Sequence, residues 1–145
     1  MSKLGPVASY LPHRPPMLLI DEILEVAIDH RIVCRATIHP GCVFARDGVV
    51  HPSAMIEFIA QACAILAGVT ATAGGRPLQL GFLLGCREVT FAVDRFAIGE
   101  VLTITATKTF GGQQMATFSG TVARGAEHCV AAELSVMDGA LTELA

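Results

Sequence analysis

One apolar stretch constrains the fold of this chain more than any other feature: residues 51–69, with the sequence HPSAMIEFIAQACAILAGV. It contains one carboxylate, Glu57, and one amide, Gln61, and a helix places side chains four residues apart on the same face. Pro52 suits the first turn of such a helix, and the glycines at 74–75 are typical of its end. The pattern predicts a long helix, apolar on nearly every side, at the centre of the fold.

The composition predicts one domain that buries part of its surface against another subunit. A chain of 145 residues is long enough for a single domain, residues 1–145, with its own hydrophobic core. Hydrophobic residues make up 52% and charged residues only 16%, so the charged fraction is low for an isolated chain of this size and some surface is expected to be buried against another subunit. The net charge of −3 and the lack of a Lys/Arg run argue against nucleic acid and anionic membranes as partners.

Neither a membrane span nor a metal site is expected. The apolar part of the helix, residues 55–70, is shorter than the ~20 apolar residues of a spanning helix, and Glu57 and Gln61 lie inside it. The five cysteines show no CxxC spacing, and their odd number fits the reducing cytoplasm. The N-terminal segment has prolines where a signal peptide has its apolar run, which also favours a cytoplasmic location.

Strand patterns precede and follow the helix. The expected strands are residues 17–30, 31–41, 78–93, 100–110, 114–125 and 127–137, with a loop at 40–50. Gly81 and Gly85 predict bends or bulges within their strand, and Gly111-Gly112 predicts a tight turn. An antiparallel sheet of about six strands that wraps one central helix is an α+β arrangement, the hot-dog fold.

Three motifs, in this order, carry a resemblance to a known family. LPHRPPMLLIDEILE (11–25) and IEFIAQACAILAG (56–68) resemble the first segment and the helix motif of the bacterial 3-hydroxyacyl-acyl-carrier-protein dehydratases. GFLLGCREVTF (81–91), with the later Phe96 and Gly99, is most similar to the aryl-polyene-cluster dehydratase-like subgroup. The resemblance covers residues 10 to about 105.

The resemblance implies dehydration of a 3-hydroxyacyl thioester, carried by acyl carrier protein, to a trans-2-enoyl thioester in fatty-acid or polyene-type biosynthesis. It implies no metal and no cofactor, and a homodimer, a homologous heterodimer or a larger assembly. In the family a histidine and a helix carboxylate meet across the dimer interface, where they move the protons. A backbone N–H at the start of the helix polarises the thioester carbonyl.

The sequence departs from this family at two positions. The usual histidine lies fourteen residues before the helix carboxylate, and here that position is Val43. The usual carbonyl-binding glycine lies five residues before it, and here that position is Pro52, which has no N–H. The chain must therefore find its histidine and its carbonyl donor elsewhere, or act without them.

Glu57 is the first candidate for proton transfer, with an ion pair to an interface arginine as the alternative. His13, in a proline-flanked segment, is the first choice for the missing histidine, although it could instead cap backbone; His51, immediately before the helix, is the second. Gln61 is expected at the substrate, where it would orient Glu57 or bind water; as the alternative it is a buried structural amide. The N–H groups of Ser53 and Ala54 at the helix start are expected to bind the substrate as well. Arg14 is expected to contact the carrier or its phosphate.

Two other functions remain compatible with the residues. In an acyl thioesterase of the same fold, Glu57 would activate water or attack the thioester directly. In a non-catalytic partner subunit, the chain would stabilise an active dehydratase, which the missing histidine permits.

Overall fold

The structure of the chain is a computed structural model that describes residues 4–111 and 115–139. A single long helix, α1 (Met55–Ala73), follows two 3₁₀ turns, Val7–Ser9 and Pro52–Ala54. The strands are β1 (Glu22–Ala27), β2 (Arg31–Thr37), β3 (Ala45–Arg46), β4 (Val49–Val50), β5 (Leu80–Phe91), β6 (Phe96–Ala97), β7 (Val101–Gly111), β8 (Met115–Arg124) and β9 (Glu127–Gly139).

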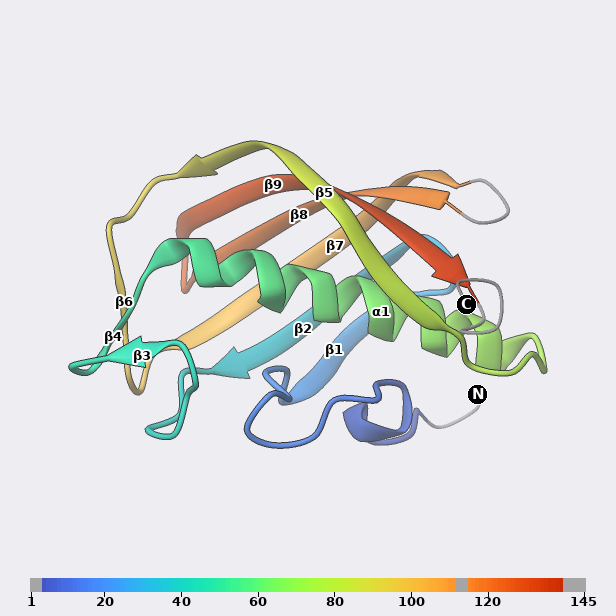
Figure 1. The fold of residues 1–145 in the computed structure, drawn as a ribbon, viewed down its shortest axis with the longest axis horizontal. Coiled ribbons are helices and arrows are strands. Elements are labelled where there is room, and N and C mark those ends of the chain that lie inside the picture. Colours follow the sequence, from blue (N-terminus) through green and yellow to red (C-terminus); the bar gives the residue numbers. More distant parts are fainter. Residues whose placement is uncertain (1–3, 112–114, 140–145) are drawn as a thin grey trace.

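Six of the strands form one sheet in the order β1-β2-β7-β8-β9-β5, and every neighbouring pair is antiparallel. The helix crosses this sheet, and β5 passes over the helix on the way to its place at the sheet edge (Figure 1). β3, β4 and β6 form a small second sheet beside the start of α1 (Figure 1). The predicted arrangement of one long helix against a six-stranded antiparallel sheet is confirmed.

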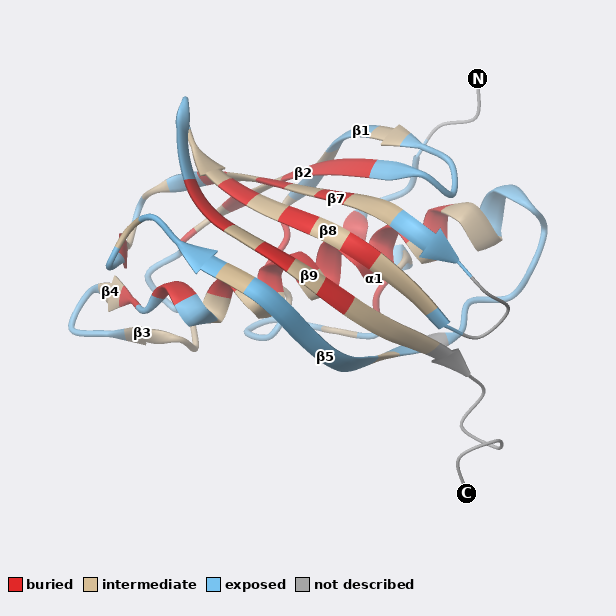
Figure 2. Cartoon of the chain, turned by 90° about the horizontal axis from the view of Figure 1, so that it is seen from above, coloured by how far each residue is buried: buried red, intermediate tan, exposed pale blue. Residues whose placement is uncertain are grey.

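The core lies between α1 and the middle strands, where buried residues follow β2, β7, β8 and β9 (Figure 2). The alternation predicted for β2 and β7 is confirmed, because the apolar residues on one face of each strand are fully buried and pair across the two strands. These pairs are Ile32 with Ala106, Cys34 with Ile104, and Ala36 with Leu102.

The helix has the surroundings of a core helix. Its length and apolar composition would allow it to cross a membrane, but 61% of its most apolar 18-residue window is buried inside the structure. Gly120 of β8 faces Ile59, and a Cβ at this glycine would overlap the Ile59 side chain. The missing side chain thus lets the sheet approach the helix closely. The helix ends as predicted, with Gly74 at its C-cap and Gly75 in the left-handed region at φ 68°.

The strand predicted at 17–30 is shorter in the structure, because its first residues are used differently. Only Glu22–Ala27 forms β1, and earlier in the segment the backbone of Met17 and Leu19 binds the side chain of Gln61. The segment 40–50, predicted as a loop, contains the two-residue strands β3 and β4 around the expected Asp47-Gly48 turn. Strands this short leave no alternation to read in the sequence.

The long strand β5 is irregular at two places. Its register shifts between Leu83 and Gly85, as predicted for Gly85, and again between Arg87 and Thr90. Gly81 stays in regular register opposite Asp138, so the strand has no bulge there, and the alternative of a bend stays a prediction. The turn predicted at Gly111-Gly112 includes a residue outside the described part of the chain.

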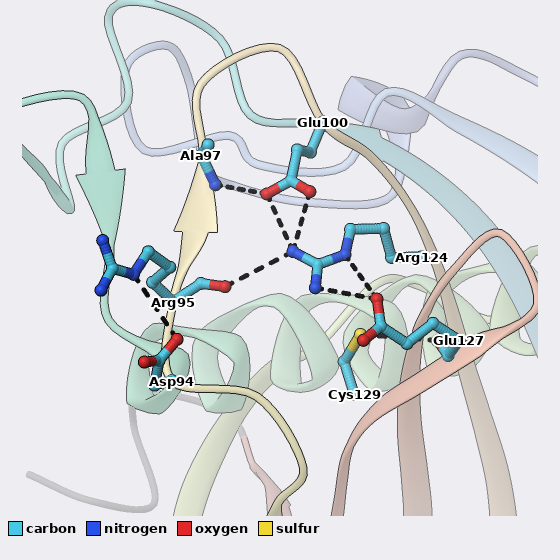
Figure 3. A network of polar contacts seen from close by, with 7 residues as sticks. All are labelled: Asp94, Arg95, Ala97, Glu100, Arg124, Glu127 and Cys129. Carbon is cyan, nitrogen blue, oxygen red and sulfur yellow. Dashed lines mark hydrogen bonds and ion pairs between the residues drawn. The ribbon is translucent and has the colours of Figure 1, made fainter.

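Arg124 fastens the β8–β9 hairpin to the segment that contains β6 (Figure 3). Its guanidinium contacts Glu127 at 2.8 Å and Glu100 at 2.8 Å, donates to the carbonyl of Arg95 at 3.4 Å, and lies 5.4 Å from the ring centre of Phe96. The hydrogen bond to Glu127 and the charge of Glu100 raise the pKa of Arg124. This network joins the turn between β8 and β9 to the segment beside the start of α1 (Figure 1).

Candidate active site

Glu57 lies in the first turn of α1 and faces the N-terminal segment of the same chain. The Nε2 atom of His13 lies 3.7 Å from its Oε1 atom, and the two side chains are 30% and 32% exposed. His13 is the only cationic or imidazole side chain within 4.0 Å of this carboxylate in the described part of the chain. The structure therefore brings together the first carboxylate and the first histidine chosen from the sequence, within one chain.

Gln61 bonds Glu57 and the backbone of the segment that follows His13. It is 1% exposed, its Oε1 accepts from the N–H of Leu19 at 2.9 Å, and its Nε2 donates to the carbonyl of Met17 at 2.8 Å and to Glu57 Oε1 at 3.2 Å. One side chain thus ties the segment after His13 to the helix and orients the carboxylate. Gln61 is in the position expected for orienting Glu57.

Arg14 holds the backbone around His13. Its Nη1 atom donates to the carbonyls of Leu11 at 2.8 Å and His13 at 2.7 Å. The neighbouring Leu11 is buried in the core, which anchors this segment from the other side. The Nδ1 atom of His13 is buried without a hydrogen-bond partner in the described chain, a condition that favours a ligand or water there. Contact between Arg14 and a carrier stays a prediction.

The start of the helix is closed by its own cap. His51 Nδ1 accepts from the N–H of Ser53 at 3.1 Å, and the N–H of Ala54 donates to the carbonyl of His51 at 3.0 Å. Since Pro52 has no N–H, the structure as it stands offers no free donor at residues 52–54. His51 lies apart from the His13–Glu57 pair, with its ring centre 6.4 Å from that of Phe91. The roles predicted for His51, Ser53 and Ala54 require these bonds to rearrange and stay predictions.

A groove of about 680 Å³ starts at His13 and Glu57 and follows one face of α1. Four alanines form its floor at helical spacing: Ala60, Ala64, Ala67 and Ala71. Phe82 and Leu83 of β5 and Phe118 of β8 line its wall. The far end is polar, with Asp29, Thr70, Arg76, Gln79 and Lys108.

A second cavity, of about 540 Å³, has a mostly apolar lining. It lies between the N-terminal segment and the end of β2, and Val7, Leu18, Ile20 and Phe58 line it. In residues 4–111 and 115–139, no group of three or more His, Cys, Asp or Glu side chains has the arrangement of a metal site.

A sequence model of the ApeP-like family, described as ApeP dehydratase, matches residues 5–144. The chain belongs to the ApeP-like dehydratase family. This confirms the resemblance read from the three motifs. In the structure of the dehydratase heterocomplex ApeI:P from Xenorhabdus doucetiae, one chain is 28% identical to this ApeP-like chain, with a TM-score of 0.91. The alignment covers 98% of this chain and 96% of that one.

More distant structures share the fold alone. A hypothetical thioesterase with coenzyme A from Streptococcus pneumoniae TIGR4 is 12% identical, has a TM-score of 0.63, and aligns over 82% of this chain and 85% of its own. Thioesterase superfamily member 2 from zebra fish is 14% identical, has a TM-score of 0.66, and aligns over 89% and 88%. These neighbours confirm the hot-dog fold of this ApeP-like chain.

Sequence reasoning missed the groove of the ApeP-like chain, although part of its signal was visible. The alanines at 60, 64, 67 and 71 repeat at intervals of four, three and four residues after Glu57, so they share its face of the helix. Arg76 and Lys108 carry no such signal, because only the folded chain brings them to the same end of the groove.

Proposed function

We propose that this chain dehydrates 3-hydroxyacyl thioesters to trans-2-enoyl thioesters in the biosynthesis of fatty-acid or polyene-type chains. The observation that carries the proposal is the pairing of His13 Nε2 with Glu57 Oε1 at 3.7 Å at one end of a groove. Membership of the ApeP-like dehydratase family supports it. The substrate is a thioester carried by acyl carrier protein, and the location is cytoplasmic.

The reaction needs two proton transfers on neighbouring carbons. His13 takes the proton from the α-carbon, the C–H electrons form the new double bond, and the C–O bond at the β-carbon breaks. Glu57 gives its proton to the departing hydroxide, so water leaves. His13 then holds one proton more and Glu57 one fewer, and a transfer across the gap between them restores the pair without a cofactor.

The carbonyl of the thioester needs a hydrogen-bond donor when negative charge develops on its oxygen. The N–H of Ser53 is the nearest candidate at the helix start, where the helix dipole also favours negative charge. In this proposal the thioester oxygen replaces His51 Nδ1 as the acceptor from Ser53. His51 is exposed, so its ring has room to turn away.

A second hot-dog chain, identical or homologous, would complete the site. Among the described strands, β5 is an edge strand that pairs with β9 alone, and Leu83, Leu84 and Phe91 on it are 43%, 50% and 45% exposed. Since β5 also lines the groove, a chain paired with this edge would close the groove on its open side. The related chain in the ApeI:P structure comes from a heterocomplex, which supports such an assembly.

The test is to incubate the purified protein, alone and together with a co-expressed homologous hot-dog chain, with a 3-hydroxyacyl thioester. Enoyl absorbance and free thiol are followed together. The proposal predicts enoyl absorbance without release of thiol, and loss of that signal in Glu57→Gln. Thiol without enoyl product would contradict it and indicate a thioesterase.

One observation favours a second candidate, the non-catalytic partner subunit. Both N–H groups at the helix start are already bonded, and Pro52 supplies none, so the carbonyl of a thioester has no donor ready there. In that case this chain stabilises an active homologue, and Glu57→Gln in this chain leaves the activity of the complex intact.

A further inference from the structure

The groove beside α1 continues far beyond the His13–Glu57 pair. Ala71, the last alanine of its floor, comes fourteen residues after Glu57, which is a distance of ~21 Å along a helix at 1.5 Å per residue. The alanine side chains are small, so a ligand on this floor can lie close to the helix. A slender, extended chain is therefore the kind of ligand that fits it.

The far end of the groove carries more positive than negative charge. Lys108 Nζ lies 2.7 Å from Asp29 Oδ1 and is only 24% exposed, so its position is fixed. Arg76 makes one long hydrogen bond, 3.5 Å, to the carbonyl of Thr70 in the last turn of the helix. No carboxylate of the described residues lies within 4.0 Å of Arg76. Both cations keep N–H donors that an anion can use.

This lining suits a polar arm better than a hydrocarbon tail. A hydrocarbon tail that reached the far end would take water away from Arg76 and Lys108 without replacing its hydrogen bonds. A chain that contains amides and ends in an anion meets hydrogen-bonding partners there, including the exposed Gln79. The more apolar lining of the two lies in the second cavity, beside Phe58.

Resting on the dehydratase function proposed above, we infer that this groove binds the phosphopantetheine arm of the substrate, with its phosphate at Arg76 and Lys108. The arm has about 16 bonds from phosphorus to the β-carbon of the acyl group, ~19 Å when extended at ~1.2 Å per bond. This length places the reacting carbons at His13 and Glu57. Arg14, the cation chosen from the sequence for the phosphate, does not line this groove.

The test compares two thioesters with the same 3-hydroxyacyl group, one on phosphopantetheine and one on N-acetylcysteamine, which lacks the phosphate. In Arg76→Gln and Lys108→Gln, the KM for the phosphopantetheine thioester rises roughly tenfold or more, because a charge-assisted hydrogen bond is lost. The KM for the N-acetylcysteamine thioester stays within about twofold of the wild-type value. Arg46→Gln, at an exposed arginine in β3 outside both cavities, removes the same charge and changes neither KM.

An equal rise of both KM values in the two variants, or no rise in either, would overturn the inference. Binding of phosphopantetheine itself, measured by calorimetry, separates this result from a failure of the proposed function. Wild-type binding that Arg76→Gln weakens about tenfold supports the groove even if no thioester is dehydrated. Equal binding by the wild type and both variants contradicts it.

Discussion

At the scale of single residues, the site depends on the hydrogen bonds that Gln61 makes. A distance of 3.7 Å between His13 and Glu57 is longer than a hydrogen bond but short enough for one atom of a substrate to contact both groups. Gln61 keeps this spacing, because it bonds Glu57 directly and the segment after His13 through Met17 and Leu19.

Replacing Gln61 by leucine therefore affects both stability and catalysis. The variant leaves the N–H of Leu19 and the carbonyl of Met17 without their partner, so we expect a loss of about 2–4 kcal/mol in the free energy of unfolding. Where the variant remains folded, kcat falls more than KM rises, because Glu57 is no longer oriented. Denaturant unfolding and steady-state kinetics measure the two effects.

The control is Thr72→Val, on an exposed position of the same helix, which we expect to change the free energy of unfolding by less than about 0.5 kcal/mol. A Gln61→Leu variant with wild-type stability and wild-type kcat would show that the buried amide has no positioning role.

Burial of Cys34 gives a pH dependence that can be measured. Burial raises the pKa of this thiol from 9.0 to about 12 in the folded chain. Above pH 9 the unfolded chain releases this proton while the folded chain keeps it. The contribution of Cys34 to the free energy of unfolding is therefore fully present below pH 9 and is lost as the pH rises toward 12. We expect the free energy of unfolding of Cys34→Ala to fall less steeply than that of the wild type between pH 9 and pH 11.

The matched control is Cys86→Ala, which removes an exposed thiol instead of a buried one. Identical slopes for Cys34→Ala and the wild type would contradict the prediction.

At the scale of elements, the close approach of β8 to α1 at Gly120 is the most sensitive contact. A methyl group at this position overlaps Ile59, which is fully buried and cannot move aside. We expect Gly120→Ala to lower the free energy of unfolding by about 1–3 kcal/mol. A double variant with Ile59→Val recovers part of this loss, because the shorter side chain makes room; a double variant no more stable than Gly120→Ala would contradict this account.

The elements that sequence could predict are those that are long and locally encoded. The helix was visible because its residues are apolar on nearly all sides and two glycines follow it, and β2 and β7 were visible because Ile32 and Ile104 belong to clear alternations. The short β1 could not be predicted, because Gln61, more than forty residues away in the chain, binds the backbone before it.

The same limit applies to the candidate site. Glu57 and Gln61 stand out in an apolar helix, and His13 stands out between prolines, so all three could be chosen before the structure. The closed cap formed by His51 and the far end of the groove at Lys108 depend on rotamers and on contacts between distant segments. No local pattern encodes them.

At the scale of the whole molecule, the free edge of β5 is where a second chain is expected. Leu84 lies at the first register shift of this strand and is 50% exposed. We expect Leu84→Asp to weaken the assembly at least tenfold by placing a charge against an apolar partner, as measured by analytical ultracentrifugation. An equivalent charge at Leu4, which is 43% exposed outside the sheet, leaves the mass of the assembly unchanged. Unchanged assembly in both variants would place the interface elsewhere.

The central claim is that His13 and Glu57 of one chain form one catalytic pair. The direct measurement is the rate of enoyl thioester formation by His13→Ala, by Glu57→Gln, and by a mixed assembly of the two, co-expressed with different tags and purified through both. We expect each variant to lose at least about 100-fold in kcat and the mixed assembly to remain as inactive, since neither chain holds a complete pair. Recovery of activity in the mixed assembly, or near wild-type activity of Glu57→Gln, would contradict the claim.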